Sequence, residues 1–138
     1  MKAVIVALVL VLVGSAPALA QLKPDVEQWL TQDEARAALL GIDMDGYSPS
    51  AGMAWRECID PQGTTLYETP FGVQNGVLEI NEWGEACFAY DDDDYASWQC
   101  FRVRLTGTGI VFENDFGDVF VTTSLVRGVR TCRPELIG

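Results

Sequence analysis

The chain contains two stretches that alternate between apolar and polar residues, EACFAY (residues 85–90) and WQCFRVRL (residues 98–105). Alternation with a period of two is typical of strands that bury one face. If the six residues 91–96 form the loop between them, Cys87 lies directly opposite Cys100. Opposed residues in an antiparallel pair have Cα atoms ~4.5–5.5 Å apart, which is within disulfide range. The stretch therefore predicts a hairpin that is closed by a Cys87–Cys100 disulfide.

The same register assigns the two faces of this hairpin. One face carries apolar residues that we expect in the core: Phe88, Tyr90, Phe101, Val103 and Leu105. On the other face, Glu85 lies opposite Arg102, and opposite charges at such positions form a cross-strand ion pair.

Outward from this hairpin, short β-like segments recur between turn residues. We expect strands over 53–59, 63–69, 86–90, 98–105, 109–113, 118–123 and 125–132. Asn75-Gly76 is the strongest two-residue hairpin signal, which places a turn between residues 73–74 and 77–78. Strands at this spacing, each within reach of the next, indicate an antiparallel meander.

One helix precedes the strands. Thr31 and Glu34 form a capping box, good helix formers follow, and Gly41 stands where a helix ends, so a helix is expected over about 32–40. The segment 41–48 resembles the middle of an EF-hand loop but lacks two of its main ligands, so we interpret it as a turn that leads into the first strand. The predicted fold is mainly β: a meander that forms a small barrel or sandwich-like sheet, with the short N-terminal helix against one opening.

The N-terminal residues predict export. A basic start and an apolar run over 3–13 precede Ala18-Leu19-Ala20, which is the pattern of a signal-peptidase site. The run is shorter than the ~20 apolar residues that a membrane-spanning helix needs. We therefore expect a signal peptide over 1–20 and a single disulfide-stabilised β domain over 21–138, soluble in the periplasm or secreted, with no membrane association after cleavage.

The chain is strongly acidic. It has 20 Asp and Glu residues against 9 Lys and Arg, a net charge of −11, and removal of residues 1–20, which hold one Lys and no acid, makes it −12. This charge argues against nucleic acid and anionic membranes as partners, since both are bound through Lys and Arg. It suits a basic protein partner, a cation, or solubility alone.

The cysteine and histidine counts limit the chemistry. Four cysteines in an exported chain indicate two disulfides, and with Cys87–Cys100 we expect Cys58–Cys132 among the three possible connectivities. The chain has no His, which removes Ser–His and Cys–His nucleophiles and makes a zinc site improbable. We expect no cofactor and no enzymatic activity.

The acidic run between the two cysteine strands is the most unusual local feature. Asp91, Asp92, Asp93 and Asp94 are adjacent, and carboxylates are the ligands that Ca²⁺ prefers. A solvated loop that blocks edge pairing explains the run equally simply, so it is a weak calcium candidate. Together with Trp83 and Tyr95, which also fall in expected loops, it forms the predicted binding surface.

Aromatic residues in the expected strands have two interpretations. They fill the core, or they line a barrel mouth or a sugar-binding platform: Trp55, Tyr67, Phe88, Tyr90 and Trp98.

Several segments resemble a family of small exported proteobacterial proteins of unknown function: residues 55–58, 60–67, 76–80, 84–90 and 100–103. The shared features are an Asp-x-x-Gly-Thr turn, here Asp60 to Thr64, and two strands that carry Cys followed by Phe or Tyr. The resemblance covers about residues 52–105, and the chain departs from it with Val77-Leu78 where the family usually shows Trp. It implies an exported β-rich domain and supplies no catalytic residues.

The sequence leaves several functions open. The first is a binding or structural module without catalysis, acting as a monomer or small homo-oligomer. The others are an inhibitor of a basic enzyme such as a lysozyme or protease, a calcium-stabilised module, and a hydrolase that uses two carboxylates.

Overall fold

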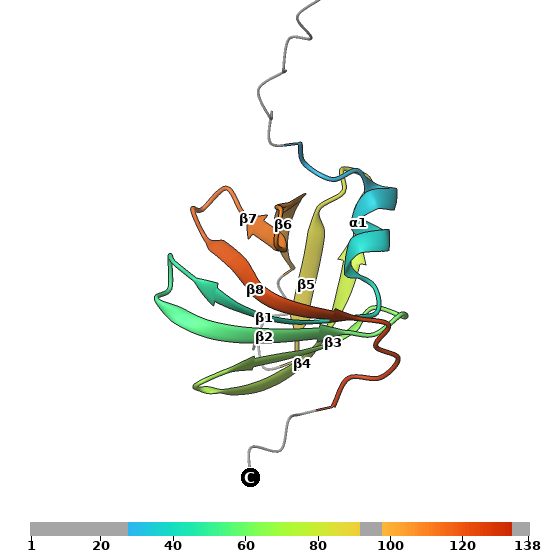
Figure 1. The fold of residues 1–138 in the computed structure, drawn as a ribbon. Helices are drawn as coiled ribbons and strands as arrows, with labels where there is room; N and C mark the ends of the chain where they lie inside the picture. The colour runs from blue at the N-terminus through green and yellow to red at the C-terminus, as the bar shows by residue number, and fades with distance from the viewer. Residues whose placement is uncertain (1–27, 92–97, 134–138) are drawn as a thin grey trace, which may run out of the picture.

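In the computed structural model, which describes residues 28–91 and 98–133, eight antiparallel strands close into a barrel (Figure 1). The strands are β1 (Ile42–Ser48), β2 (Met53–Ile59), β3 (Thr64–Thr69), β4 (Gly72–Ile80), β5 (Ala86–Tyr90), β6 (Gln99–Leu105), β7 (Ile110–Glu113) and β8 (Val119–Arg127). Each strand pairs with the next along the chain, and β8 pairs with β1 to close the ring. The expected antiparallel meander is confirmed, and it closes into a barrel rather than forming a sandwich-like sheet.

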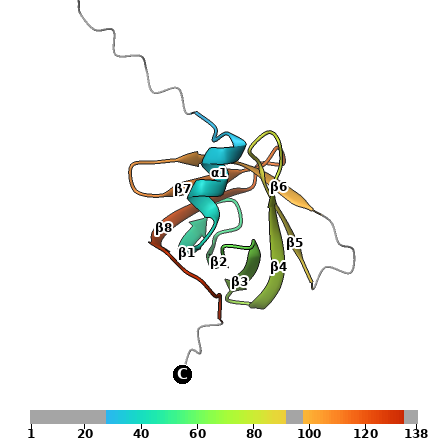
Figure 2. The same ribbon diagram turned by 90° about the vertical axis from the view of Figure 1, so that its right-hand side faces the viewer.

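The helix α1 (Gln32–Leu39) covers one end of the barrel (Figure 2). Its capping box is present, with Thr31 and Glu34 hydrogen-bonded in both directions. Leu39 is fully buried, and Gln32 Nε2 donates a hydrogen bond of 3.1 Å to the carbonyl of Ile80 at the end of β4. No helix among the described residues is long and apolar enough to cross a bilayer.

The barrel interior differs between its two halves. Beneath α1 the core is aliphatic, with fully buried Leu39, Ile42, Ile59, Val103 and Ile110. Toward the other end the interior side chains are mainly aromatic. This division matters because aliphatic side chains pack the helix end tightly, whereas the aromatic half keeps some internal space.

Both expected disulfides are present. Cys87 pairs with Cys100 in the β5–β6 register, and their Cα atoms are 3.9 Å apart, closer than the general spacing of opposed residues. Cys58 of β2 is bonded to Cys132, which ties the segment after β8 back onto the sheet. The hairpin register deduced from the two cysteine strands is therefore correct.

Two details of that hairpin are wrong. Leu105 is half-exposed rather than in the core, because it is the last residue of β6. Arg102 makes its ion pair with Asp115, at 3.4 Å, and its guanidinium lies 4.7 Å from the ring centre of Trp29. Glu85 instead accepts a hydrogen bond of 2.7 Å from the Asn81 amide.

The segment interpreted as a turn after the helix is strand β1. Ile42 and Met44 point into the barrel, while Asp43 and Asp45 face outward and bond to Arg56 and Ser124. The acidic residues that indicated a turn are thus partners on the outer face of the sheet.

The Asn75-Gly76 turn is also wrong, because both residues lie inside β4. The β3–β4 turn is formed by Pro70-Phe71, and Thr69 pairs with Gly72 across it. Local turn propensity at position 76 is overridden by packing, as described for the site below.

The two strands expected over 118–123 and 125–132 are one strand, β8, which ends at Arg127. The pairing of β8 with β1 shifts its register between Asp45 and Gly46, and β8 continues past the shift as one strand. After Arg127, the backbone N–H of Gly128 donates a hydrogen bond of 2.9 Å to the carbonyl of Gly41, and the chain leaves the sheet.

Candidate functional site

A cavity of about 80 Å³ lies inside the aromatic half of the barrel. Seven of the eight strands contribute to its lining, which consists of Met44, Trp55, Glu57, Tyr67, Phe88, Tyr90, Gln99, Phe101, Phe112 and Phe120. It lies on the side of the barrel away from α1 and opens to solvent beside Gln99, which is exposed at the start of β6. The barrel is therefore closed at one end and hollowed at the other.

The aromatic rings support one another through edge and face contacts. Trp55 meets Phe112 and Phe120 edge-on, with ring centres 6.3 and 5.9 Å apart. Tyr90 lies parallel to Phe88 and contacts Tyr67, with ring centres 5.4 Å apart. Such pairs fix ring positions beyond what burial alone would do. The walls are thus held in place without a ligand.

Two glycines provide space for two of these rings. A Cβ atom at position 76 would lie 2.5 Å from the Ala89 carbonyl oxygen and 2.7 Å from Tyr90 Cδ1. A Cβ atom at position 46 would overlap the indole of Trp55. Glycine is the residue that allows such close approach in a strand. The glycine of the Asn75-Gly76 pattern therefore allows the close approach of Tyr90 in the site and does not form a turn.

Glu57 is the one acid among the described residues that line the cavity. It lies on β2 between the inward-facing Trp55 and Ile59, and only 4% of its surface is exposed. The Tyr90 hydroxyl donates a hydrogen bond of 2.9 Å to Glu57 Oε2. Within the described residues, Glu57 Oε1 and Trp55 Nε1 are buried without a hydrogen-bond partner. Buried polar atoms are normally satisfied, so the unpartnered Oε1 of a cavity-lining acid indicates a position where a further group can bind.

Burial raises the pKa of Glu57 to about 8. The hydroxyls of Tyr90 and Thr65 act in the opposite direction but do not offset the burial, and Thr65 Oγ1 is outside normal hydrogen-bond geometry. Burial and the nearby charge of Glu57 raise the pKa of Tyr67 to about 12. At neutral pH the cavity therefore holds a mostly protonated carboxyl and the neutral phenol of Tyr67.

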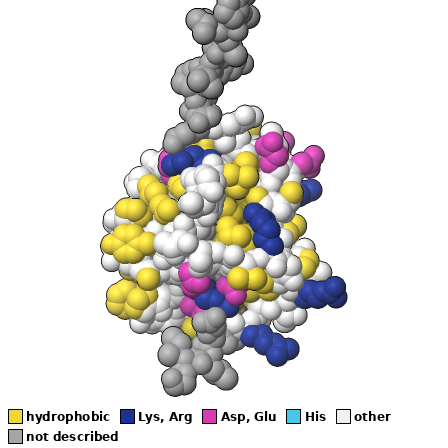
Figure 3. Space-filling model, viewed as in Figure 1, with side chains coloured by type: hydrophobic (Ala, Val, Ile, Leu, Met, Phe, Trp, Pro, Cys, Tyr) yellow, Lys and Arg dark blue, Asp and Glu magenta, His cyan; other side chains and the backbone are white. Residues whose placement is uncertain are grey.

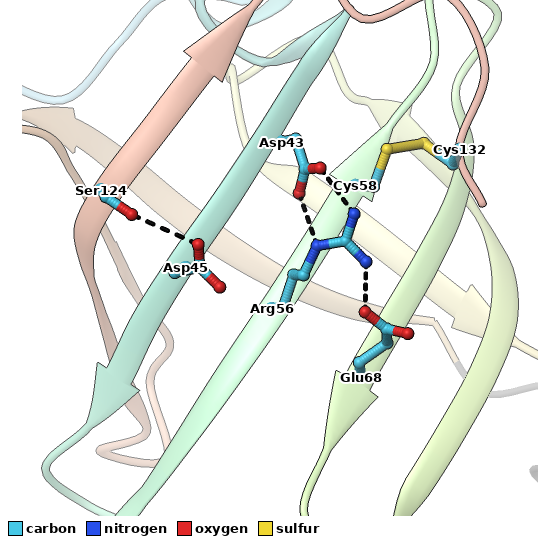
Figure 4. Close-up of polar contacts among 7 residues, drawn as sticks. All are labelled: Asp43, Asp45, Arg56, Cys58, Glu68, Ser124 and Cys132. Atoms are coloured by element: carbon cyan, nitrogen blue, oxygen red, sulfur yellow. Dashed lines mark hydrogen bonds and ion pairs between the residues drawn. A yellow bond between two sulfur atoms is a disulfide. The ribbon is translucent and has the colours of Figure 1, made fainter. Parts of the chain in front are cut away.

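A second polar cluster lies on the outer face of the barrel (Figure 4). Arg56 of β2 binds Asp43 of β1 through Nε and Nη2, at 2.9 and 2.6 Å, and Glu68 of β3 through Nη1. Burial acts to lower the pKa of Arg56, but the hydrogen bonds and charges of the two acids outweigh it and raise that pKa. The cluster links three strands next to the Cys58–Cys132 disulfide. Its charged groups already bind one another, so we assign it a role in the stability of the barrel.

Of the residues predicted as a binding surface, the structure describes Trp83 and Asp91, which lie at opposite ends of β5. Trp83 is 73% exposed and lies in the turn before β5, whereas Asp91 follows the other end of that strand. Asp92, Asp93, Asp94 and Tyr95 lie outside the described residues. Within the part of the chain that the structure describes, no three His, Cys, Asp or Glu residues cluster to hold a metal.

The core interpretation of the aromatics holds for Trp55 and Phe88, which are buried in the hydrophobic core, and Tyr67 and Tyr90 pack against that core. All four also line the cavity, while Trp98 is half-exposed on the outside. Glu57 is a site residue that was not predicted from the sequence. Its signal was present, because Glu57 shares the inward face of β2 with Trp55 and Ile59, and an acid on an apolar face needs an explanation.

Exposed apolar side chains surround the open end. Phe71, in the β3–β4 turn, is 89% exposed, and Phe116, in the β7–β8 turn, is 93% exposed. In Figure 3, hydrophobic side chains gather along the left edge, where the β1–β2 and β3–β4 hairpins end in Figure 1. This rim is suited to contact with an apolar surface.

Comparison of the chain with protein-family models, curated proteins and solved structures finds no match. Function is therefore argued from the cavity itself.

Proposed function

We propose that this protein is an exported binding barrel that holds a small ligand, or a small group of a larger one, in its aromatic cavity. The observation that carries the proposal is Glu57, a buried acid that offers an unpartnered Oε1 to a cavity open to solvent. Apolar walls with a few placed polar groups are typical of ligand sites, as are barrel mouths.

The polar groups of the lining favour binding over catalysis. The described lining offers one carboxyl, two phenols and one amide, all suited to hydrogen bonding: Glu57, Tyr67, Tyr90 and Gln99. A hydrolase of the two-carboxylate type needs a second acid ~5–10 Å from the first. Glu57 has no such acid beside it among the described lining residues.

Export is part of the proposal. It is supported by the signal-peptide pattern over 1–20 and by two disulfides, which form and persist in oxidising compartments. Expression of the full chain in a bacterial host followed by mass spectrometry tests it. We expect oxidised protein outside the cytoplasm that begins near Gln21, and uncleaved cytoplasmic protein would contradict export.

A fragment screen by NMR tests the ligand site. We expect small apolar and amphiphilic compounds to shift the resonances of Met44 and Gln99, which line the cavity. Gln99→Trp, at the opening, should block these shifts, while Gln62→Trp, in an exposed turn, should not. If no fragment of any chemistry perturbs the lining, the cavity is not a binding site.

A second candidate, an inhibitor of a basic enzyme, is favoured by the exposed Phe71 and Phe116 at the rim of an acidic protein. We expect one enzyme in a panel of purified lysozymes and proteases to be inhibited, with a loss of at least about tenfold in affinity for Phe71→Ser, as is typical of an interface anchor. Equal binding to all basic enzymes would show charge attraction only.

A further inference from the structure

We propose that the group held in the cavity is a primary ammonium on a short alkyl stem, which donates an N–H to Glu57 Oε1. This inference rests on the proposed function and names the ligand class of the same site.

Hydrogen bonding defines the first requirement. Glu57 Oε2 already accepts from the Tyr90 hydroxyl, whereas Oε1 is buried without a partner in the described part of the chain. The ionised form of Glu57 only accepts hydrogen bonds, so a ligand that binds this form through Oε1 must present a donor. A quaternary ammonium carries no N–H and would leave Oε1 unsatisfied.

Charge defines the second requirement. Trp55, Tyr67, Phe88 and Tyr90 surround the acid, and the faces of aromatic rings attract cations. The described lining contains no Lys or Arg, so nothing there neutralises the carboxylate. Tyr67 and Tyr90 are the other titratable groups of the described lining, and burial raises the pKa of Tyr67 to about 12, so its phenol is neutral near pH 7. An ammonium is the donor that such a site favours over a neutral one.

Size defines the third requirement. The cavity of about 80 Å³ is smaller than the ~150 Å³ that holds a benzene molecule. It admits an amino group with a few methylenes, while the rest of the ligand stays outside the opening. A free alkylamine and a lysine side chain of a protein both fit this description, and they share the chemistry that the site recognises.

The protonation of Glu57 gives the inference a distinctive signature. With a pKa of about 8, the acid is mostly protonated at pH 7 in the empty cavity. An incoming ammonium favours the carboxylate, so Glu57 loses its proton to solvent while the ammonium keeps all of its own. Binding should therefore release close to one proton at pH 7, and affinity should rise with pH until the acid is ionised.

Calorimetry and NMR with four probes test the proposal on the mature protein: n-butylammonium, tetramethylammonium, 1-butanol and Nα-acetyl-lysine N-methylamide. We expect n-butylammonium to bind about 25-fold more tightly at pH 8.5 than at pH 6.5, which is the ratio of the ionised fractions of Glu57 for a pKa of about 8. Calorimetry in two buffers of different ionisation enthalpy should show the released proton. Tetramethylammonium and 1-butanol should bind at least about tenfold more weakly, because each lacks either the N–H or the charge.

Glu57→Gln should abolish the preference for n-butylammonium over 1-butanol and the proton release. Glu79→Gln, an exposed acid on β4, is the matched control and should change neither. Tight binding of the lysine derivative would identify a protein lysine as the source, and binding of n-butylammonium alone would identify a free amine.

Equal binding of n-butylammonium and 1-butanol, unaffected by Glu57→Gln, would overturn the inference and leave the binding barrel intact. If the fragment screen finds no ligand at all, the proposed function itself fails.

Discussion

Tyr90 of β5 donates its hydroxyl hydrogen to Glu57 of β2 across the barrel interior, at 2.9 Å. These two strands are not neighbours, since β3 and β4 separate them in the sheet. The bond therefore joins opposite walls through the cavity and fixes the orientation of the one acid that faces it. A buried acid held in this way affects stability as well as binding.

Replacing Glu57 by Gln should change how stability depends on pH. The pKa of Glu57 is about 8 in the folded state and 4.5 as a reference, so between these values the folded protein binds more protons than the unfolded chain. Stability from this group is thus fully present below pH 4.5 and is lost as the pH rises toward 8. By pH 8 we expect the free energy of unfolding of the wild type to have fallen by about 3–4 kcal/mol more than that of Glu57→Gln.

Urea denaturation of both proteins from pH 5 to 8.5 measures this difference. Glu79→Gln serves as the control, because Glu79 is exposed on β4. Parallel stability curves for wild type and Glu57→Gln would contradict the assignment of a strongly raised pKa.

Gly76→Ala should destabilise the barrel. The added methyl would lie 2.5 Å from the Ala89 carbonyl oxygen, so the backbone or the Tyr90 ring must shift. Overpacking of this kind costs about 1–3 kcal/mol. Gly107→Ala is the matched control, since no atom lies within 4 Å of its Cβ position, and it should stay within about 0.5 kcal/mol of wild type.

Arg56→Lys should cost about 1–3 kcal/mol, because an ammonium cannot bind Asp43 through two N–H groups and reach Glu68 as well. The two acids would keep their burial and lose part of their hydrogen bonding. Thermal unfolding gives the value, with Arg130→Lys on the exposed segment after β8 as the control. Equal melting temperatures for the two variants would show that the cluster adds nothing to stability.

The two disulfides should contribute unequally. Cys58 and Cys132 are 74 residues apart, and Cys87 and Cys100 are 13 apart. On the chain-entropy model these loops are worth ~4.5 and ~3 kcal/mol, respectively. We expect the double Ser variant of the longer loop to unfold at lower denaturant, and the reverse order would mean that native packing outweighs loop entropy.

The fold was predictable where local pattern and packing agree. The alternation around Cys87 and Cys100 gave the register, and Thr31 and Glu34 gave the helix start. The β1 strand was missed because Asp43 and Asp45 resemble loop residues until their partners on β2 and β8 are known. Those partners are distant in sequence, so no local pattern reveals them.

The candidate site was predictable only in part, for a similar reason. Its aromatic residues could be named, but a ring in the core and a ring around a cavity have the same sequence pattern. Gly76 gave the wrong signal because its small size serves the Tyr90 ring rather than a turn. Glu57 carried the clearest sign, as an acid on the apolar face of a strand.

The helix that covers one end of the barrel determines how a ligand can be exchanged. Because Leu39 and its aliphatic neighbours fill that end, a bound group leaves through the other end, where Gln99 is the exposed residue of the described lining. A second ligand cannot enter behind the first and displace it. Dissociation should then follow one rate constant, independent of the concentration of any competitor.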